Sequence, residues 1–197
     1  MVDKETKTSI RGIKRGTVVL LLFIIIAGAL FVWWSVQRAD REMREGLLQQ
    51  TRLVAQALNI ERVRALSGTK ADLGTSNYLW LKEQLANVRI ANKKCRFIYL
   101  MGRKADNTIF FFVDNEAVGS KDEAPAGMIY DDVPEGFRRV FLTGVADTQG
   151  PFTDKWGVFV SSAVPVFDPV TGELIAVLAM DIDAGVWKWD VAAQAAL

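Results

Sequence analysis

Aspartates are the most prominent side chains in this sequence that could bind a small molecule. Asp181 ends the segment Ile175–Asp181, in which alternate residues are apolar, so a strand would place its carboxylate at the end of an apolar row. A carboxylate at that depth needs a cation or hydrogen-bond donors, because a buried unpaired charge is strongly destabilising. Asp181 is therefore predicted either to bind a ligand or to cap nearby amides. Asp154 lies in a Thr-Asp-Lys-Trp-Gly turn, where it is either a second ligand contact or an ordinary turn residue.

Aromatic and basic residues supply the other candidates for a ligand site. Tyr99 and Tyr130 could present their hydroxyl groups to a ligand, although packing in the core is the usual role of a buried tyrosine. Trp156 could line a pocket or pack against its own hairpin. Arg103 shares a predicted strand face with Tyr99, and it could pair with an anionic ligand or with Asp114 across the hairpin.

The composition argues against most catalytic chemistry. The 197 residues include no histidine and one cysteine, and the formal net charge is +1. The sequence has no Ser/His/Asp set, no glycine-rich phosphate loop and no Cys or His metal cluster, so we expect neither enzymatic activity nor a cofactor. The acidic run Asp131-Asp132, with Glu135 nearby, matches no calcium loop and is expected to be a solvated loop. The balanced charge also argues against a nucleic-acid partner.

Residues 16–37 contain no charged side chain and predict a transmembrane helix, because about 20 apolar residues span the hydrocarbon core of a bilayer. Trp33 and Trp34 lie where an interfacial aromatic belt would fall. A cleaved signal peptide is the alternative, but the run is long and lacks a small-residue cleavage site. Five basic residues precede the span and three follow it closely, which predicts a cytoplasmic tail at 1–15 and an extracytoplasmic domain on the inner membrane of a cell.

Two helices are expected after the span. Residues 38–58 contain no proline and one glycine, and this helix is expected to pack on its own domain, to pair with its copy in a homodimer, or both. Residues 77–90 form an amphipathic pattern whose apolar face includes Leu81 and Leu85, with Lys82 directed away from it. Thr75, Ser76 or Asn77 would cap its start.

The pattern then changes to that of strands. We expect a first hairpin formed by residues 96–104 and 108–114 and a second formed by 157–166 and 174–182. A helix at 133–143 and a short strand at 146–152 are expected between the two hairpins. Helices combined with such hairpins predict an α+β domain with an antiparallel sheet. The long segment 115–145 would cover one face of that sheet, where binding sites often lie.

Several of these segments together resemble the Cache (PAS-like, PDC-type) sensor domains of bacterial and archaeal transmembrane receptors. The resemblance rests on Tyr-Leu-Met-Gly-Arg-Lys at 99–104, Phe-Phe-Phe-Val-Asp at 110–114, Gly-Pro-Phe-Thr-Asp-Lys-Trp-Gly at 150–157, Pro-Val-Phe-Asp-Pro-Val-Thr-Gly at 165–172 and Ala-Val-Leu-Ala-Met-Asp-Ile at 176–182. It implies a five-stranded antiparallel sheet, a long N-terminal helix, frequent dimerisation and a ligand pocket under the covering loop. These features would occupy residues 38–185.

The resemblance also implies roles for two residues. Asp154 and Asp181 match the aspartates that contact ligand in amino-acid-binding members, but the Arg-x-Trp-Tyr element that holds the ligand carboxylate has no match here. The expected function is small-molecule sensing for a histidine kinase or diguanylate cyclase. The alternative is a membrane-anchored interaction or scaffold domain without a ligand. Residues 186–197, with Trp187 and Trp189, are expected to begin a second membrane helix that leads to an output module.

Overall fold

The computed structural model describes the backbone of residues 2–196 and the side chains of residues 16–196. The chain forms two compact parts, residues 42–190 and a second part made of residues 1–41 with 191–197. The charged tail predicted at 1–15 has side chains outside the described set. Residues 42–190 contain the whole sheet and all of the predicted site residues.

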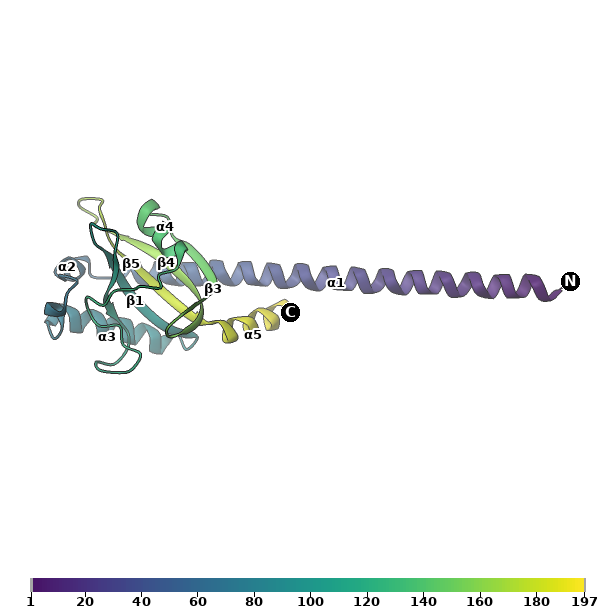
Figure 1. Cartoon of the computed structure of the whole chain (residues 1–197), viewed down its shortest axis with the longest axis horizontal. Helices are drawn as coiled ribbons and strands as arrows, with labels where there is room; N and C mark the ends of the chain where they lie inside the picture. The colour runs from purple at the N-terminus through teal and green to yellow at the C-terminus, as the bar shows by residue number, and fades with distance from the viewer. Residues whose placement is uncertain (1, 197) are drawn as a thin grey trace. The chain divides into compact units, whose positions relative to one another are not determined.

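The predicted helices and strands lie close to their expected positions, and the short helices α2 and η1 are additional to them (Figure 1). In chain order they are α1 Val2–Gln56, α2 Ile60–Arg64, the 3-10 helix η1 Lys70–Asp72, α3 Ser76–Ala91, β1 Cys95–Arg103, β2 Ile109–Asp114, α4 Glu135–Thr143, β3 Asp147–Asp154, β4 Gly157–Phe167, β5 Leu174–Asp183 and α5 Ala184–Ala195.

Helix α1 is continuous through the boundary predicted near residue 38. From Gly16 to Gln56 it is long and apolar enough to cross a membrane by length and composition, and its most apolar stretch has no buried residue. In the part that belongs to residues 42–190, Leu47, Thr51 and Ala55 are buried. This helix therefore packs on its own domain, as predicted, through residues spaced four apart.

The five strands form one antiparallel sheet in the order β2-β1-β5-β4-β3, which confirms the predicted fold class. The central strand β5 lies between β1 and β4, with Asp181 opposite Phe97 on one side and opposite Ser161 on the other. Residues directly opposite each other project from the same face of a sheet. Asp181, Phe97 and Ser161 therefore share one face, the inner face.

Helices and a long loop cover the two faces of the sheet. Helix α4 and the loop 115–134, called the covering loop, contribute Phe137, Val140 and Tyr130 to a core formed with inner-face residues. Helices α1 and α3 cover the opposite, outer face. There the hydroxyl of Thr51 on α1 forms a short hydrogen bond with that of Ser162 on β4, and both side chains are fully buried.

Turn and cap residues account for the element boundaries. Thr75 caps α3 by accepting a hydrogen bond from the Tyr78 amide at 3.3 Å, as one of the three predicted caps. In the β1–β2 turn Asn107 has a φ of 66°, a conformation that asparagine tolerates. Asp183 accepts hydrogen bonds from the amides of Gly185 and Val186 and so begins α5.

Lys82 of α3 was predicted to point away from the apolar face of the helix, but its side chain is buried. Its side chain is 8% exposed, and its Nζ lies 2.6 Å from Asp114 Oδ1 and 3.0 Å from Glu123 Oε1. The predicted alternative pairing of Arg103 with Asp114 is therefore wrong. Lysine can follow an apolar surface with its long aliphatic stem and still bring its ammonium group to a carboxylate, so its position on the helix wheel did not reveal the contact.

Candidate functional site

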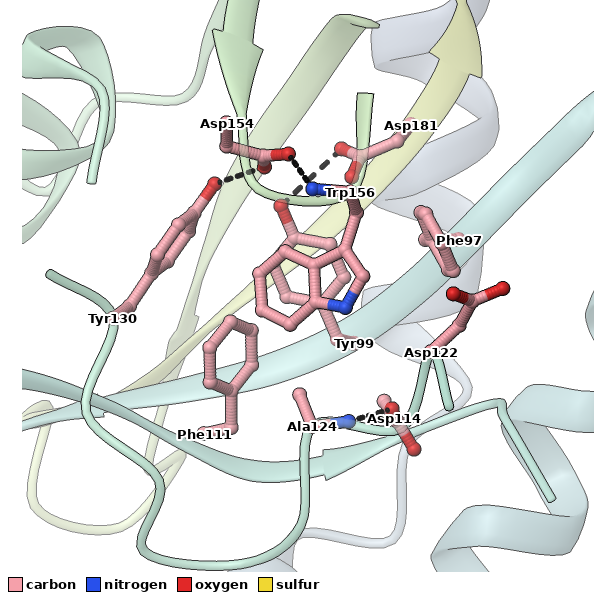
Figure 2. Close-up of a pocket in the computed structure, with 10 residues that line it drawn as sticks. All are labelled: Phe97, Tyr99, Phe111, Asp114, Asp122, Ala124, Tyr130, Asp154, Trp156 and Asp181. Atoms are coloured by element: carbon pink, nitrogen blue, oxygen red, sulfur yellow. Dashed lines mark hydrogen bonds between the residues drawn. The ribbon is translucent and has the colours of Figure 1, made fainter. Parts of the chain in front are cut away.

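A small, partly enclosed cavity lies between the inner face of the sheet and the covering loop (Figure 2). Its walls come from β1, β2 and β5, from the β3–β4 hairpin and from the covering loop. The lining residues are Phe97, Tyr99, Phe111, Asp114, Asp122, Ala124, Tyr130, Asp154, Trp156 and Asp181. Four carboxylates and five aromatic rings thus surround it, and among the lining residues of the described chain there is no lysine or arginine.

Asp181 lies at one end of the cavity and is 2% exposed. Its Oδ1 accepts a hydrogen bond of 3.3 Å from the hydroxyl of Tyr99. Burial raises the pKa of the Asp181 carboxyl to about 7; the Ser161 hydroxyl and Tyr99 lower it, and the nearby charge of Asp154 adds to the rise. Ser161 is itself fully buried and lies directly opposite Asp181 in the sheet.

Asp154 lies at the same end of the cavity and is held by its turn. Its Oδ1 accepts hydrogen bonds from the amides of Trp156 at 2.8 Å and Gly157 at 3.2 Å, the pattern of an Asx turn. Its Oδ2 accepts a 2.9 Å hydrogen bond from the Tyr130 hydroxyl, which comes from the covering loop. The turn therefore fixes the carboxylate, and the tyrosine attaches the covering loop to it.

Aromatic rings form the middle of the cavity. Phe111 lies 5.3 Å from Tyr99, 4.9 Å from Tyr130 and 5.7 Å from Trp156, measured between ring centroids. Burial raises the pKa of both tyrosines further above their ordinary value, and neighbouring carboxylates add to the rise, so both hydroxyls remain protonated. They are therefore fixed hydrogen-bond donors to the two carboxylates at this end.

Asp114 lies at the opposite end and belongs to a buried ion cluster with Lys82 and Glu123. Its Oδ2 also accepts a 2.6 Å hydrogen bond from the amide of Ala124 in the covering loop. Burial alone would lower the pKa of Lys82, but its hydrogen bonds and the charge of Asp114 outweigh burial and raise it. Lys82 is therefore charged, and it connects α3, the end of β2 and the covering loop.

Asp122 completes this second end of the cavity. Its Oδ2 lies 2.7 Å from Arg96, whose guanidinium also lies 2.8 Å from Glu116. The first part of the covering loop is thus attached through ion pairs. The later part is attached to β2 by backbone hydrogen bonds. The amide of Phe111 donates to the carbonyl of Met128, the amide of Gly127 donates to the carbonyl of Phe111, and the amide of Tyr130 donates to the carbonyl of Ile109.

The space open to water in the cavity is about 20 Å3. A volume of this size holds about one water molecule. A larger ligand therefore enters only if the wall side chains or the covering loop move outward. Over residues 16–196, no cluster of three or more His, Cys, Asp or Glu side chains is arranged to hold a metal ion.

The structure brings five of the six predicted site residues together. The cavity is lined by Asp181, Asp154, Tyr130, Tyr99 and Trp156. Trp156 has both of the roles that were left open for it, because its side chain lines the cavity and its amide belongs to the hairpin turn. Arg103 does not line it. Its side chain is exposed and its guanidinium lies 5.9 Å from the ring of Phe141.

Sequence reasoning did not select Phe97, Phe111, Asp114, Asp122 and Ala124 as site residues. Strand alternation placed Phe97 on the face of Tyr99, and that signal could have identified it. Asp122 lies in an irregular loop, where no periodicity reports the direction of a side chain.

No protein-family model matches the chain, and no curated protein matches its sequence. Solved structures do share its fold. The ligand-binding domain of the Campylobacter jejuni chemoreceptor Tlp3 in complex with L-valine has a TM-score of 0.55 and 13% identity, over 82% of this chain and 60% of that one. The chain therefore spans about 60% of the length of the Tlp3 domain.

Two further structures have a similar level of likeness. The Escherichia coli DcuS sensor domain has a TM-score of 0.52 and 15% identity, over 75% of this chain and 96% of that one. The ligand-binding domain of the Pseudomonas aeruginosa chemoreceptor PctC in complex with GABA has a TM-score of 0.51 and 13% identity, over 82% of this chain and 64% of that one. The chain thus has the fold of the ligand-binding domains of two chemoreceptors and of the DcuS sensor domain.

Proposed function

We propose that this chain is the small-molecule-sensing part of a transmembrane signalling receptor. The observation that carries the proposal is the partly enclosed cavity between sheet and covering loop, with the buried carboxylate of Asp181, the half-buried carboxylate of Asp154 and no cation in its described lining. A buried carboxylate without a paired cation is unfavourable for stability, and such groups are often found where a ligand supplies the missing charge. The shared fold with chemoreceptor and DcuS sensor domains supports the same function.

The ligand is a small molecule with an ammonium group. Asp181 and Asp154 can accept its hydrogen bonds, and the rings of Tyr99, Tyr130 and Trp156 provide the aromatic surroundings that favour a cation. A ligand carboxylate would find no arginine or lysine in the described lining. The site therefore favours an amine over an amino acid or a dicarboxylate.

The membrane arrangement is part of the same proposal. The apolar stretch of α1 crosses the inner membrane, residues 42–190 lie outside the cytoplasm, and a second span leads to a histidine kinase or diguanylate cyclase module. Two copies pair as a homodimer. The apolar character of α1 and the excess of basic residues before it support the orientation.

A short chain of contacts connects the cavity to α1. Ser161 lies opposite Asp181 on the inner face, and the next residue, Ser162, forms a hydrogen bond with Thr51 of α1 on the outer face. A ligand that shifts β4 near Asp181 therefore acts on α1 through one buried contact. For a signal to pass, the ligand must bind one arrangement of this contact more tightly than another.

Thermal unfolding of the full chain in detergent micelles tests the proposal against a library of primary amines, amino acids and dicarboxylates. A ligand at about 100 times its dissociation constant adds about 2.7 kcal/mol to the free energy of unfolding, or about 5 to 10 °C in melting temperature. We expect amines to give such a shift, Asp181→Asn to abolish it, and the exposed control Asp131→Asn to retain it. A library in which no amine stabilises the folded chain would refute the proposal and favour an anchored scaffold domain.

A further inference from the structure

Trp156 differs from the other aromatic residues that line the cavity. Phe97, Tyr99, Phe111 and Tyr130 are between 2% and 6% exposed, whereas Trp156 is half-buried. The first three project from β1 and β2, which are hydrogen-bonded to each other within the sheet. Trp156 instead belongs to the turn that joins β3 to β4. Its side chain can therefore move without disturbing a strand.

The solvent side of the cavity is marked by its half-buried lining residues, which are Asp122, Asp154 and Trp156. Asp122 is held by an ion pair with Arg96, and Asp154 accepts hydrogen bonds from its own turn and from Tyr130. The indole of Trp156 takes part in neither kind of interaction within the described part of the chain. It is therefore the least constrained of the three side chains.

Packing and one cation hold the indole in place. Its ring centroid lies 5.7 Å from that of Phe111, 6.0 Å from that of Tyr130 and 6.4 Å from that of Phe97 (Figure 2). The ammonium group of the exposed Lys155 lies 4.1 Å from the same ring centroid. A cation contact at an exposed site is weak, and moving the ring leaves no hydrogen-bonding group without its partner.

The backbone around the indole is fixed. The amides of Trp156 and Gly157 both donate hydrogen bonds to Asp154 Oδ1. The hydroxyl of Tyr130 donates to Asp154 Oδ2, and the covering loop at 127–130 is hydrogen-bonded to β2. Rotation of the Trp156 side chain about its own bonds therefore requires no movement of the hairpin or of this part of the loop.

The cavity holds about one water molecule in this arrangement, so a ligand needs further room. We propose that the indole of Trp156 is the gate of the site: it rotates outward to admit a ligand, and the ligand takes its place between Phe97, Phe111 and Tyr130. Because rotation brings the buried part of an aromatic side chain into water, the ring lowers the population of the open state about 10- to 100-fold. This inference rests on the proposed sensing function, and it adds the residue that controls entry to the site.

Cysteine labelling of the full chain in detergent micelles measures the opening. Ala124 is 4% exposed and lines the cavity, and Figure 2 shows its methyl group pointing toward the aromatic rings. Ala126 is 1% exposed in the same loop and does not line the cavity. Each alanine is replaced by cysteine in a separate chain, and the buried Cys95 serves in both as an internal reporter of unfolding.

The probes are two thiol reagents of opposite charge, the cation 2-aminoethyl methanethiosulfonate and the anion 2-sulfonatoethyl methanethiosulfonate. With Ala124→Cys, we expect Trp156→Ala to raise the labelling rate about 10- to 100-fold for both probes, because the rate follows the population of the open state. Trp156→Phe keeps a smaller ring and should raise the rate less. Neither change should alter the labelling of Cys95 or of the thiol in Ala126→Cys. Mass spectrometry after proteolysis locates each label.

The other outcomes are also decisive. An unchanged rate in both Trp156 variants would overturn the gate. A rise of equal size with Ala126→Cys would overturn it as well, because the whole covering loop would then open. If Trp156→Ala also exposes Cys95, that variant has unfolded, and Trp156→Phe decides the question by the same criteria.

The charge of the probes tests the proposed ammonium site separately. Each labelling rate is divided by the rate for the same chain unfolded in urea, which removes the difference in intrinsic reactivity between the two reagents. An acidic cavity should then favour the cationic probe at Ala124→Cys. Equal normalised rates for the two probes would contradict the ammonium site and leave the gate intact.

Discussion

Replacing Asp181 by asparagine removes the buried charge and keeps the shape of the side chain. Burial raises the pKa of the Asp181 carboxyl from 3.8 to about 7. The folded protein therefore retains a proton on this group at pH values where the unfolded chain has lost it. A difference of about three pKa units corresponds to about 4 kcal/mol, so the ionised carboxylate lowers the free energy of unfolding by about that amount.

The sign of the effect defines the pH range for the measurement. Below about pH 4 the carboxyl is protonated in both states and has no pH-dependent effect on stability. Between about pH 4 and pH 7 the unfolded chain ionises first, so the wild-type protein loses stability as the pH rises. Above about pH 7 the loss is complete. Asparagine cannot ionise, so the variant does not undergo this loss.

Urea denaturation of the full chain in detergent micelles, followed by tryptophan fluorescence, measures the effect at pH 5 and pH 8. The free energy of unfolding of Asp181→Asn minus that of the wild type should rise by about 2 to 3 kcal/mol between these pH values. Other titrating groups cancel in this comparison, and Asp131→Asn at an exposed site should show no such rise. A difference that is the same at pH 5 and pH 8 would refute the reasoning about the buried carboxyl.

Three further measurements address other parts of the domain. Lys82→Met leaves two buried carboxylates without their cation, so it should lower the free energy of unfolding by about 3 to 5 kcal/mol in the same urea assay. A loss below about 1 kcal/mol, which is typical of an exposed ion pair, would contradict the buried cluster. Thr51→Val leaves the Ser162 hydroxyl unpaired and should cost about 1 to 3 kcal/mol, whereas Thr51→Ser should retain most of the stability. Cys95 is buried and its thiol pKa is raised to about 12, so a maleimide should label it in urea but not in the folded chain; rapid labelling without urea would show that β1 is open there.

The strands were predictable because their side chains alternate or form continuous apolar runs. β1, β2, β4 and β5 all begin and end within a residue or two of their predicted limits. Alternation also placed Asp181 at the end of an apolar row, and its burial confirms that position. The sequence therefore contained enough information to predict which face of the sheet the aspartate shares.

The second end of the cavity was not predictable in this way. Helical periodicity assigned Lys82 to the polar face of α3, but that pattern describes the direction of the Cβ atom and not the place that a long side chain reaches. Asp122 comes from a loop without periodicity. Arg103 lies on the predicted face of β1, opposite Ile109, but its side chain is exposed. The face that a residue shares therefore did not by itself decide whether it lines the cavity.

The covering loop is fastened in two different ways, and salt distinguishes them. Its later residues, 127–130, are hydrogen-bonded to β2 like an extra edge strand, and those bonds are nearly insensitive to ionic strength. Its earlier residues are held by Lys82 and by Arg96, and the pairs of the partly exposed Arg96 weaken as dissolved ions screen them. We therefore expect amide hydrogens at 117–122 to exchange with solvent sooner than those at 127–130. Higher ionic strength therefore weakens the attachment of the earlier part of the covering loop and leaves the later part attached to β2.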